Sequence, residues 1–165
     1  MVSKRFIRIL LSGFLLMFVA FIGLYSFTIT QKNLSEKNDE TVYLETLETN
    51  MNMMAQLELD ETMTLQKYSA GKITNVDAHT EVLEISTKRQ KLEDTFFSRI
   101  SPETFLQVHN ELREANKLWI QADALYAKGS LENKNNFILD ADVKVEIAKQ
   151  KLASAKDKLT IVNKK

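Results

Sequence analysis

Apolar side chains recur at alternating spacings of three and four residues through most of this chain, and this pattern constrains its fold most strongly. The spacing puts them on one face of an α-helix, which must be buried against another element. Four successive segments carry such a stripe. The stripes are formed by Leu44, Leu47, Met51, Met54, Leu57, Leu65 and Tyr68; by Ala78, Val82, Ile85, Arg89, Leu92 and Phe96; by Phe105, Val108, Leu112, Ala115, Trp119, Ala122 and Tyr126; and by Ile138, Ala141, Val145, Ala148, Leu152, Ala155, Leu159 and Val162.

Residues that end or begin helices separate the four segments. Gly71 suits the left-handed position after a helix, and Thr74 suits the N-cap of the next one. Ser101 followed by Pro102 indicates the start of a third helix, and Gly129 indicates its end. The helices are expected at residues 31–70, 75–100, 102–128 and 131–163.

The segment from Ile9 to Ile29 contains about 21 residues and no Asp, Glu, Lys or Arg. As a helix it would be about 30 Å long, the thickness of a bilayer's hydrocarbon core. Lys4, Arg5 and Arg8 precede it, which by the positive-inside rule places the N-terminus in the cytoplasm. An uncleaved signal anchor is expected, with a cleaved signal peptide as the alternative.

The expected organisation is a cytoplasmic N-terminus at residues 1–8, a transmembrane signal anchor at 9–29 and an extracytoplasmic domain at 30–165. This corresponds to a single-pass protein of the bacterial inner (cytoplasmic) membrane, whose C-terminal domain is periplasmic or extracellular. One proline and four glycines leave little from which to build strand turns, and short loops favour antiparallel neighbours. The predicted fold is all-α: an antiparallel up-down-up-down four-helix bundle, preceded by a single N-terminal transmembrane helix that is continuous with helix one.

The charges and motifs of the sequence exclude several functions. All 22 acidic side chains follow Thr30, whereas three of the 22 basic ones precede it, so the expected outer domain is weakly acidic and nucleic acid is not an expected partner. The chain has no cysteine, phosphate-binding loop or nucleophile elbow, and neither His79 nor His109 follows a glutamate at di-iron spacing. The two histidines should lie at least about 20 Å apart, at the surface. No enzyme activity, metal or cofactor is therefore expected.

Arg89 is the one charged residue within the apolar stripes. Folding helix one onto helix two about the turn near residue 73 places Glu58 level with Arg89, so these two side chains are predicted to meet. One reading is an ion pair that fixes the helix register. The other reading is a polar notch that binds a small charged ligand between helices, lined by Glu58, Glu61, Thr62 and Arg89.

The chain resembles the N-terminal part of bacterial methyl-accepting chemotaxis proteins, their membrane helix followed by a four-helix-bundle ligand-binding module. The resemblance covers nearly the whole chain and lies mainly in the order and lengths of the helices. Three short sequences add to it: Ile22-Gly23-Leu24-Tyr25-Ser26, Gln31-Lys32-Asn33-Leu34 and Tyr126-Ala127-Lys128-Gly129.

This resemblance implies a sensor of small extracellular molecules that works as a dimer and signals through its last helix. The chain departs from the family in two ways. No second membrane helix, linker or signalling hairpin follows Lys165, and helix one lacks the arginines with which amino-acid sensors hold a ligand carboxylate. In their place helix one has Gln56, Glu58, Glu61 and Gln66.

The function expected from the sequence is chemoreceptor-like sensing of a small charged molecule or a partner. The chain would form a homodimer through helix one and act through a signalling or envelope protein, because it lacks its own signalling domain. A ligand would bind in the distal half, between helices one and four or at the dimer interface. The alternative is a structural or accessory interaction protein of a cell-envelope complex with no small-molecule ligand.

Overall fold

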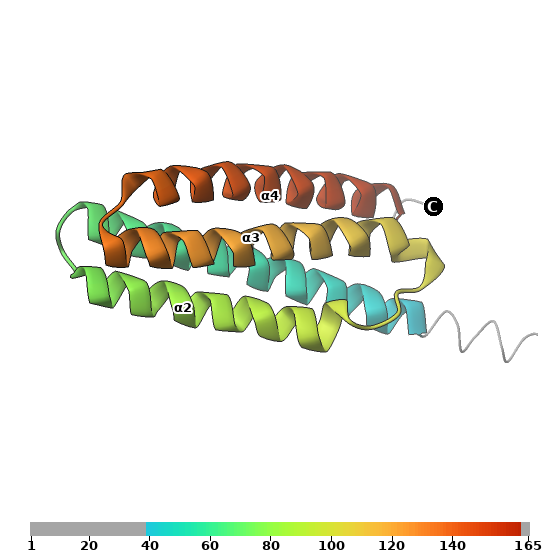
Figure 1. Cartoon of the computed structure of the whole chain (residues 1–165). Helices are drawn as coiled ribbons and strands as arrows, with labels where there is room; N and C mark the ends of the chain where they lie inside the picture. The colour runs from blue at the N-terminus through green and yellow to red at the C-terminus, as the bar shows by residue number, and fades with distance from the viewer. Residues whose placement is uncertain (1–38, 163–165) are drawn as a thin grey trace, which may run out of the picture. The chain divides into compact units, whose positions relative to one another are not determined.

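The computed structural model describes residues 39–162 (Figure 1). The chain divides into two compact units at Val42, and the second unit begins at Tyr43. The described part is all-helical, with four main helices and no strand, as predicted. The first helix occupies residues 39–69 of the described part. It is followed by α2 (Asn75–Leu92), a π-helical turn η1 (Glu93–Phe97), a 3-10 turn η2 (Glu103–Phe105), α3 (Leu106–Glu132) and α4 (Asn135–Val162).

The predicted location in a bacterial inner membrane is corrected by the structure. Within residues 39–162, none of the helices combines the length and the apolar character that crossing a bilayer requires. The segment from Ile9 to Ile29, on which that prediction was based, lies outside the described residues, as does the predicted cytoplasmic N-terminus.

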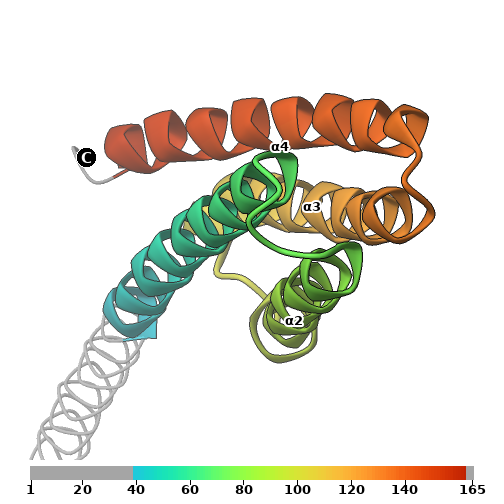
Figure 2. The ribbon, with the colours of Figure 1, turned by 90° about the vertical axis from the view of Figure 1, so that its left-hand side faces the viewer.

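Most residues of the predicted apolar stripes form the core, whereas Leu44, Leu65, Tyr68, Ile138, Val145 and Val162 are half-buried. In α2 and η1 every stripe residue from Ala78 to Phe96 is buried, and in η2 and α3 every one from Phe105 to Tyr126 is buried. Helix α3 packs against both α2 and α4 and lies between them in Figure 1. Figure 2 shows the first helix beside α4 and α2. Two apolar clusters result, a larger one around Trp119 and a smaller one around Tyr126.

The turn between the first helix and α2 forms as predicted. Gly71 has φ of +67°, the left-handed region that costs glycine little. Thr74 is the N-cap of α2, where its hydroxyl accepts a hydrogen bond from the Asp77 amide at 3.1 Å. The Asp77 carboxylate accepts from the Thr74 amide at 3.0 Å, which completes a capping box.

The predicted end of the third helix at Gly129 is wrong, because α3 continues to Glu132. Asn133 takes the left-handed position instead, with φ of 52° and ψ of 45°. Gly129 has a different role: a Cβ atom there would lie 2.9 Å from Cγ1 of Ile138 in α4. The glycine permits α3 and α4 to approach closely at this end.

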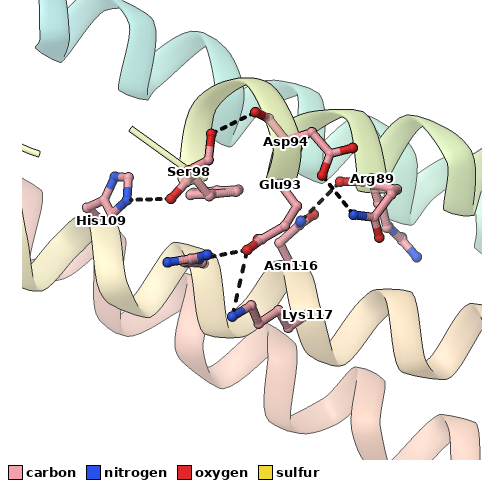
Figure 3. A network of polar contacts seen from close by, with 10 residues as sticks. Arg89, Glu93, Asp94, Ser98, His109, Asn116 and Lys117 are labelled. Atoms are coloured by element: carbon pink, nitrogen blue, oxygen red, sulfur yellow. Dashed lines mark hydrogen bonds and ion pairs between the residues drawn. The ribbon is translucent and has the colours of Figure 1, made fainter. Parts of the chain in front are cut away.

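Helix two also ends differently from the prediction. Its regular part stops at Leu92, and the π-helical turn closes with a hydrogen bond from the Ser98 amide to the Glu93 carbonyl at 3.0 Å. The predicted surface position of His109 is wrong, because this side chain is buried and only 3% exposed. Its Nε2–H donates to the carbonyl of Phe97, the last residue of the π-helical turn, at 3.3 Å (Figure 3).

Candidate functional site

Arg89 lies at the centre of a buried ionic cluster, which also contains Glu61 of the first helix and Asp123 of α3. One guanidinium nitrogen lies 2.8 Å from Oε2 of Glu61, and the other bonds to Oδ1 of Asp123. The three side chains are between 0% and 3% exposed. Asn116 donates to the backbone carbonyl of Arg89 at 3.1 Å (Figure 3), and the guanidinium lies 5.3 Å from the centre of the Trp119 ring.

The cluster carries two carboxyl groups for one guanidinium. Burial raises the pKa of Asp123 to about 8, and the neighbouring Glu61 carboxylate adds to the rise, while the Arg89 charge opposes it. A proton on Asp123 at neutral pH cancels the excess negative charge. Oε1 of Glu61 and Oδ2 of Asp123 have no hydrogen-bond partner among the described residues, so each is able to take up this proton.

The structure divides the four residues that the sequence had placed in one notch. Glu61 and Arg89 form an ion pair. The predicted pair of Glu58 and Arg89 is wrong. The Glu58 carboxylate lies 3.0 Å from Nζ of Lys149 in α4. Thr62 is exposed and faces a separate cleft. Because the ionic cluster is closed on all sides, its geometry supports the reading in which Arg89 fixes the helix register.

Asp123 was missed in the sequence because it lies next to the stripe residue Ala122. The available signal was an acidic residue one position away from the apolar stripe of the third helix. The cluster lies near the boundary between the two apolar clusters, since Trp119 belongs to the larger and Ala122 to the smaller.

A cleft of about 880 Å³ opens between the last two turns of the first helix, the loop after it and the N-terminal half of α4. Its apolar lining consists of Leu65, Ile73, Ile138 and Val145. Its uncharged polar lining consists of Thr62, Gln66, Tyr68, Ser69, Asn75, Tyr126, Asn133 and Asn135. Its charged lining consists of Asp142, Glu146 and Lys149.

Two tyrosines are fixed at the walls of this cleft. The hydroxyl of Tyr126 donates to Oδ1 of Asp142 at 2.5 Å. Burial raises the pKa of Tyr126, and the bond to the Asp142 carboxylate raises it further, so the phenol stays protonated and remains a donor. The hydroxyl of Tyr68 lies 3.3 Å from Oδ1 of Asn133 and 3.4 Å from the carbonyl of Ser130.

A second group of polar residues lies on η1 and the N-terminal half of α3 (Figure 3). Glu93 of η1 lies 2.7 Å from Arg113 and 3.7 Å from Lys117, both on α3. His109 receives a hydrogen bond at Nδ1 from the Tyr43 hydroxyl at 2.5 Å. Burial lowers the pKa of His109, which keeps this ring neutral with the proton on Nε2. Both ring nitrogens are thus used in holding helices together.

The histidines do not gather with other ligand side chains. His79 bonds through Nδ1 to the carbonyl of Ala127 at 2.9 Å, far along α3 from His109. No group of three His, Cys, Asp or Glu side chains in residues 39–162 is placed to hold a metal ion.

Comparison with known proteins gave no matching family model, no matching curated protein and no matching solved structure. The likeness to chemotaxis receptors therefore depends on the sequence features described above.

Proposed function

We propose that this chain is a sensory-type helical bundle that binds a small charged molecule in the cleft between the first helix and α4, and that it is a binding protein and not an enzyme. The cleft is the observation that carries the proposal. Its volume of about 880 Å³ falls within the range of about 300–1,000 Å³ that is usual for small-molecule sites. Its lining combines an apolar wall with charged and hydrogen-bonding groups, which is also usual for such sites.

The proposal includes an up-down-up-down arrangement of the four helices. Cross-helix contacts support it. From Glu61 to Thr64 on the first helix, the partners on α2 run backward from Arg89 to Glu81. Partners on α3 run forward, because Glu61 shares the Arg89 guanidinium with Asp123 and the Tyr68 hydroxyl donates to the carbonyl of Ser130. Opposite directions for α2 and α3 are those of an alternating bundle.

A ligand in the cleft would touch both the first helix and α4, so binding would change how these two helices pack. In the proposed mechanism the chain passes this change to a signalling partner, and two copies associate through the first helix. Met53, Leu59 and Met63 support that association, because these large apolar side chains are 43%, 52% and 47% exposed on one helix.

The second candidate is an accessory protein that assembles with other proteins and binds no small molecule. It is favoured by an exposed apolar stripe on α4, formed by Leu139, Val143 and Ile147. Residues spaced by four lie on one helix face, and an exposed face of this kind is typical of protein contacts.

Thermal unfolding of the full chain distinguishes the two candidates. The melts are recorded alone and with a panel of amines, amino acids and organic acids. A ligand at about 100 times its dissociation constant adds about 2.7 kcal/mol to the free energy of unfolding, which is a shift of several degrees. The variant Thr62→Trp fills the cleft and should abolish the shift, whereas Thr87→Trp, on the exposed face of α2, should leave it unchanged. If no compound shifts the melt, the sensor proposal fails and the accessory candidate stands.

A further inference from the structure

The charged side chains that line the cleft carry a net negative charge. Lys149 is compensated by Glu58, which lies 3.0 Å away. Asp142 and Glu146 have no cation within 4 Å among the described residues; Asp142 has only the hydrogen bond from Tyr126. The cleft therefore carries two uncompensated carboxylates and no free cation, since Lys149 is the one cation in its lining.

The two carboxylates stand on the same face of α4. Residues four apart in a helix have Cβ atoms about 5–6 Å apart, so Asp142 and Glu146 lie one above the other. The Tyr126 hydroxyl holds one oxygen of Asp142 and leaves the other free to accept. A carboxylate has about four acceptor sites, so a donor from a ligand does not need to displace the tyrosine.

Apolar side chains lie beside this pair. Ile138 precedes Asp142 by one turn on α4, Val145 lies next to Glu146, and Leu65 of the first helix and Ile73 of the following loop complete the apolar lining. The cleft thus offers an anionic spot and an aliphatic wall within one space. A bound anion would face two like charges, which destabilises binding.

We infer that the cleft binds a small aliphatic amine, with its ammonium group held by Asp142 and Glu146 and its carbon chain against Leu65, Ile138 and Val145. An ammonium has three donors and no acceptor, which matches two carboxylates. Burial is the main cause of the raised pKa of Tyr126, and the Asp142 carboxylate, which would also hold the ammonium, raises it further. The inference rests on the proposed function, because it names the ligand class of the same site.

Titration calorimetry of the full chain with three compounds of equal chain length tests the ligand class. These are 1,4-diaminobutane, 1,4-butanediol and butanedioate. We expect the diamine to bind, and the diol and the dianion to bind at least about tenfold more weakly, because a charge-assisted hydrogen bond contributes about 1.5–3 kcal/mol. Binding of the diamine should weaken as salt is added.

Charge-removing variants locate the site. Asp142→Asn and Glu146→Gln should each weaken diamine binding about tenfold or more. Asp140→Asn is the matched control, because Asp140 is an exposed acid on the same helix that does not line the cleft. Asn at position 142 can still accept from Tyr126, and an unchanged melting temperature of each variant without ligand verifies that the fold is kept.

The results separate this inference from the proposed function. Diamine binding that both variants leave unchanged overturns the inference, since the amine then binds elsewhere. Binding of the diol or the dianion that Thr62→Trp abolishes overturns the amine class but keeps the cleft as a ligand site. Failure of every compound in the panel overturns both.

Discussion

Asp123 gives the stability of this protein a pH dependence that one substitution should remove. In the folded state its pKa is raised from 3.8 to about 8 by burial, with Glu61 adding to the effect. Between these values the folded chain holds a proton that the unfolded chain has released. The free energy of unfolding therefore falls as the pH rises. The stabilisation is fully present below pH 4 and is lost as the pH passes through about 8.

The size of the effect follows from the pKa difference. Holding one extra proton changes the free energy of unfolding by about 1.4 kcal/mol per pH unit. With a folded pKa of about 8, the contribution of Asp123 should fall by about 2 kcal/mol between pH 6 and pH 8. Asp123→Asn has the shape of the protonated acid and cannot ionise, so the variant lacks this contribution to the slope.

Urea unfolding of the full chain at several values between pH 5 and pH 9, followed by circular dichroism, measures the difference. The free energy of unfolding of the wild type minus that of Asp123→Asn should fall as the pH rises from 5 to about 8 and level off above that. Asp157→Asn, an exposed acid on α4, is the control and should follow the wild-type profile. Parallel profiles for wild type and Asp123→Asn would refute the assignment of a proton to the buried cluster.

Three further substitutions test the packing. Arg89→Met should lower the free energy of unfolding by about 3–5 kcal/mol, because it leaves buried carboxyl groups without their cation. Gly129→Ala should cost about 1–3 kcal/mol, because the added methyl group meets Ile138 at 2.9 Å. Thr74→Ala should cost about 1 kcal/mol through loss of the α2 cap. Each is measured by chemical denaturation against wild type.

Other outcomes would contradict these assignments. A loss below about 1 kcal/mol for Arg89→Met is the size expected of an exposed ion pair, and would mean that water reaches the cluster. Stabilisation by Gly129→Ala is the normal result at an exposed helix position, and would mean that α3 and α4 are farther apart. No change for Thr74→Ala would show that the capping box does not contribute.

The sequence predicted the helices and their buried faces well because both follow from local periodicity. The stripe residues of α2 and α3 are buried without exception, including Arg89 and Trp119. The turn at Gly71 and Thr74 was also predicted correctly, because left-handed backbone positions and N-caps have strong residue preferences.

Features that depend on how helices approach each other were not predicted. Counting residues from a turn gives the level of a partner but not the rotation of each helix, so it selected Glu58 and not Glu61, one turn away. Asp123 comes from a third helix, whose placement the pairwise count did not include. Gly129 was read as a helix end because close packing and a left-handed turn favour the same residue.

The cleft depends on tertiary geometry in the same way. Its charged residues Asp142, Glu146 and Lys149 look like an ordinary solvated helix face in the sequence. The separation between the first helix and α4 turns that face into the wall of a cavity, and the pairing of Lys149 with Glu58 leaves the wall acidic. Neither the cavity nor the Lys149–Glu58 pair can be predicted from a local sequence pattern.

Chemical-shift mapping of the isotopically labelled full chain during titration with 1,4-diaminobutane tests directly whether the cleft binds a ligand. We expect saturable shifts concentrated in the first helix and its loop at residues 62–75, and in α4 at residues 138–149, and a midpoint at about tenfold or higher diamine concentration in Glu146→Gln. Shifts confined to other surfaces, or none at concentrations up to the millimolar range, would contradict the cleft as a ligand site.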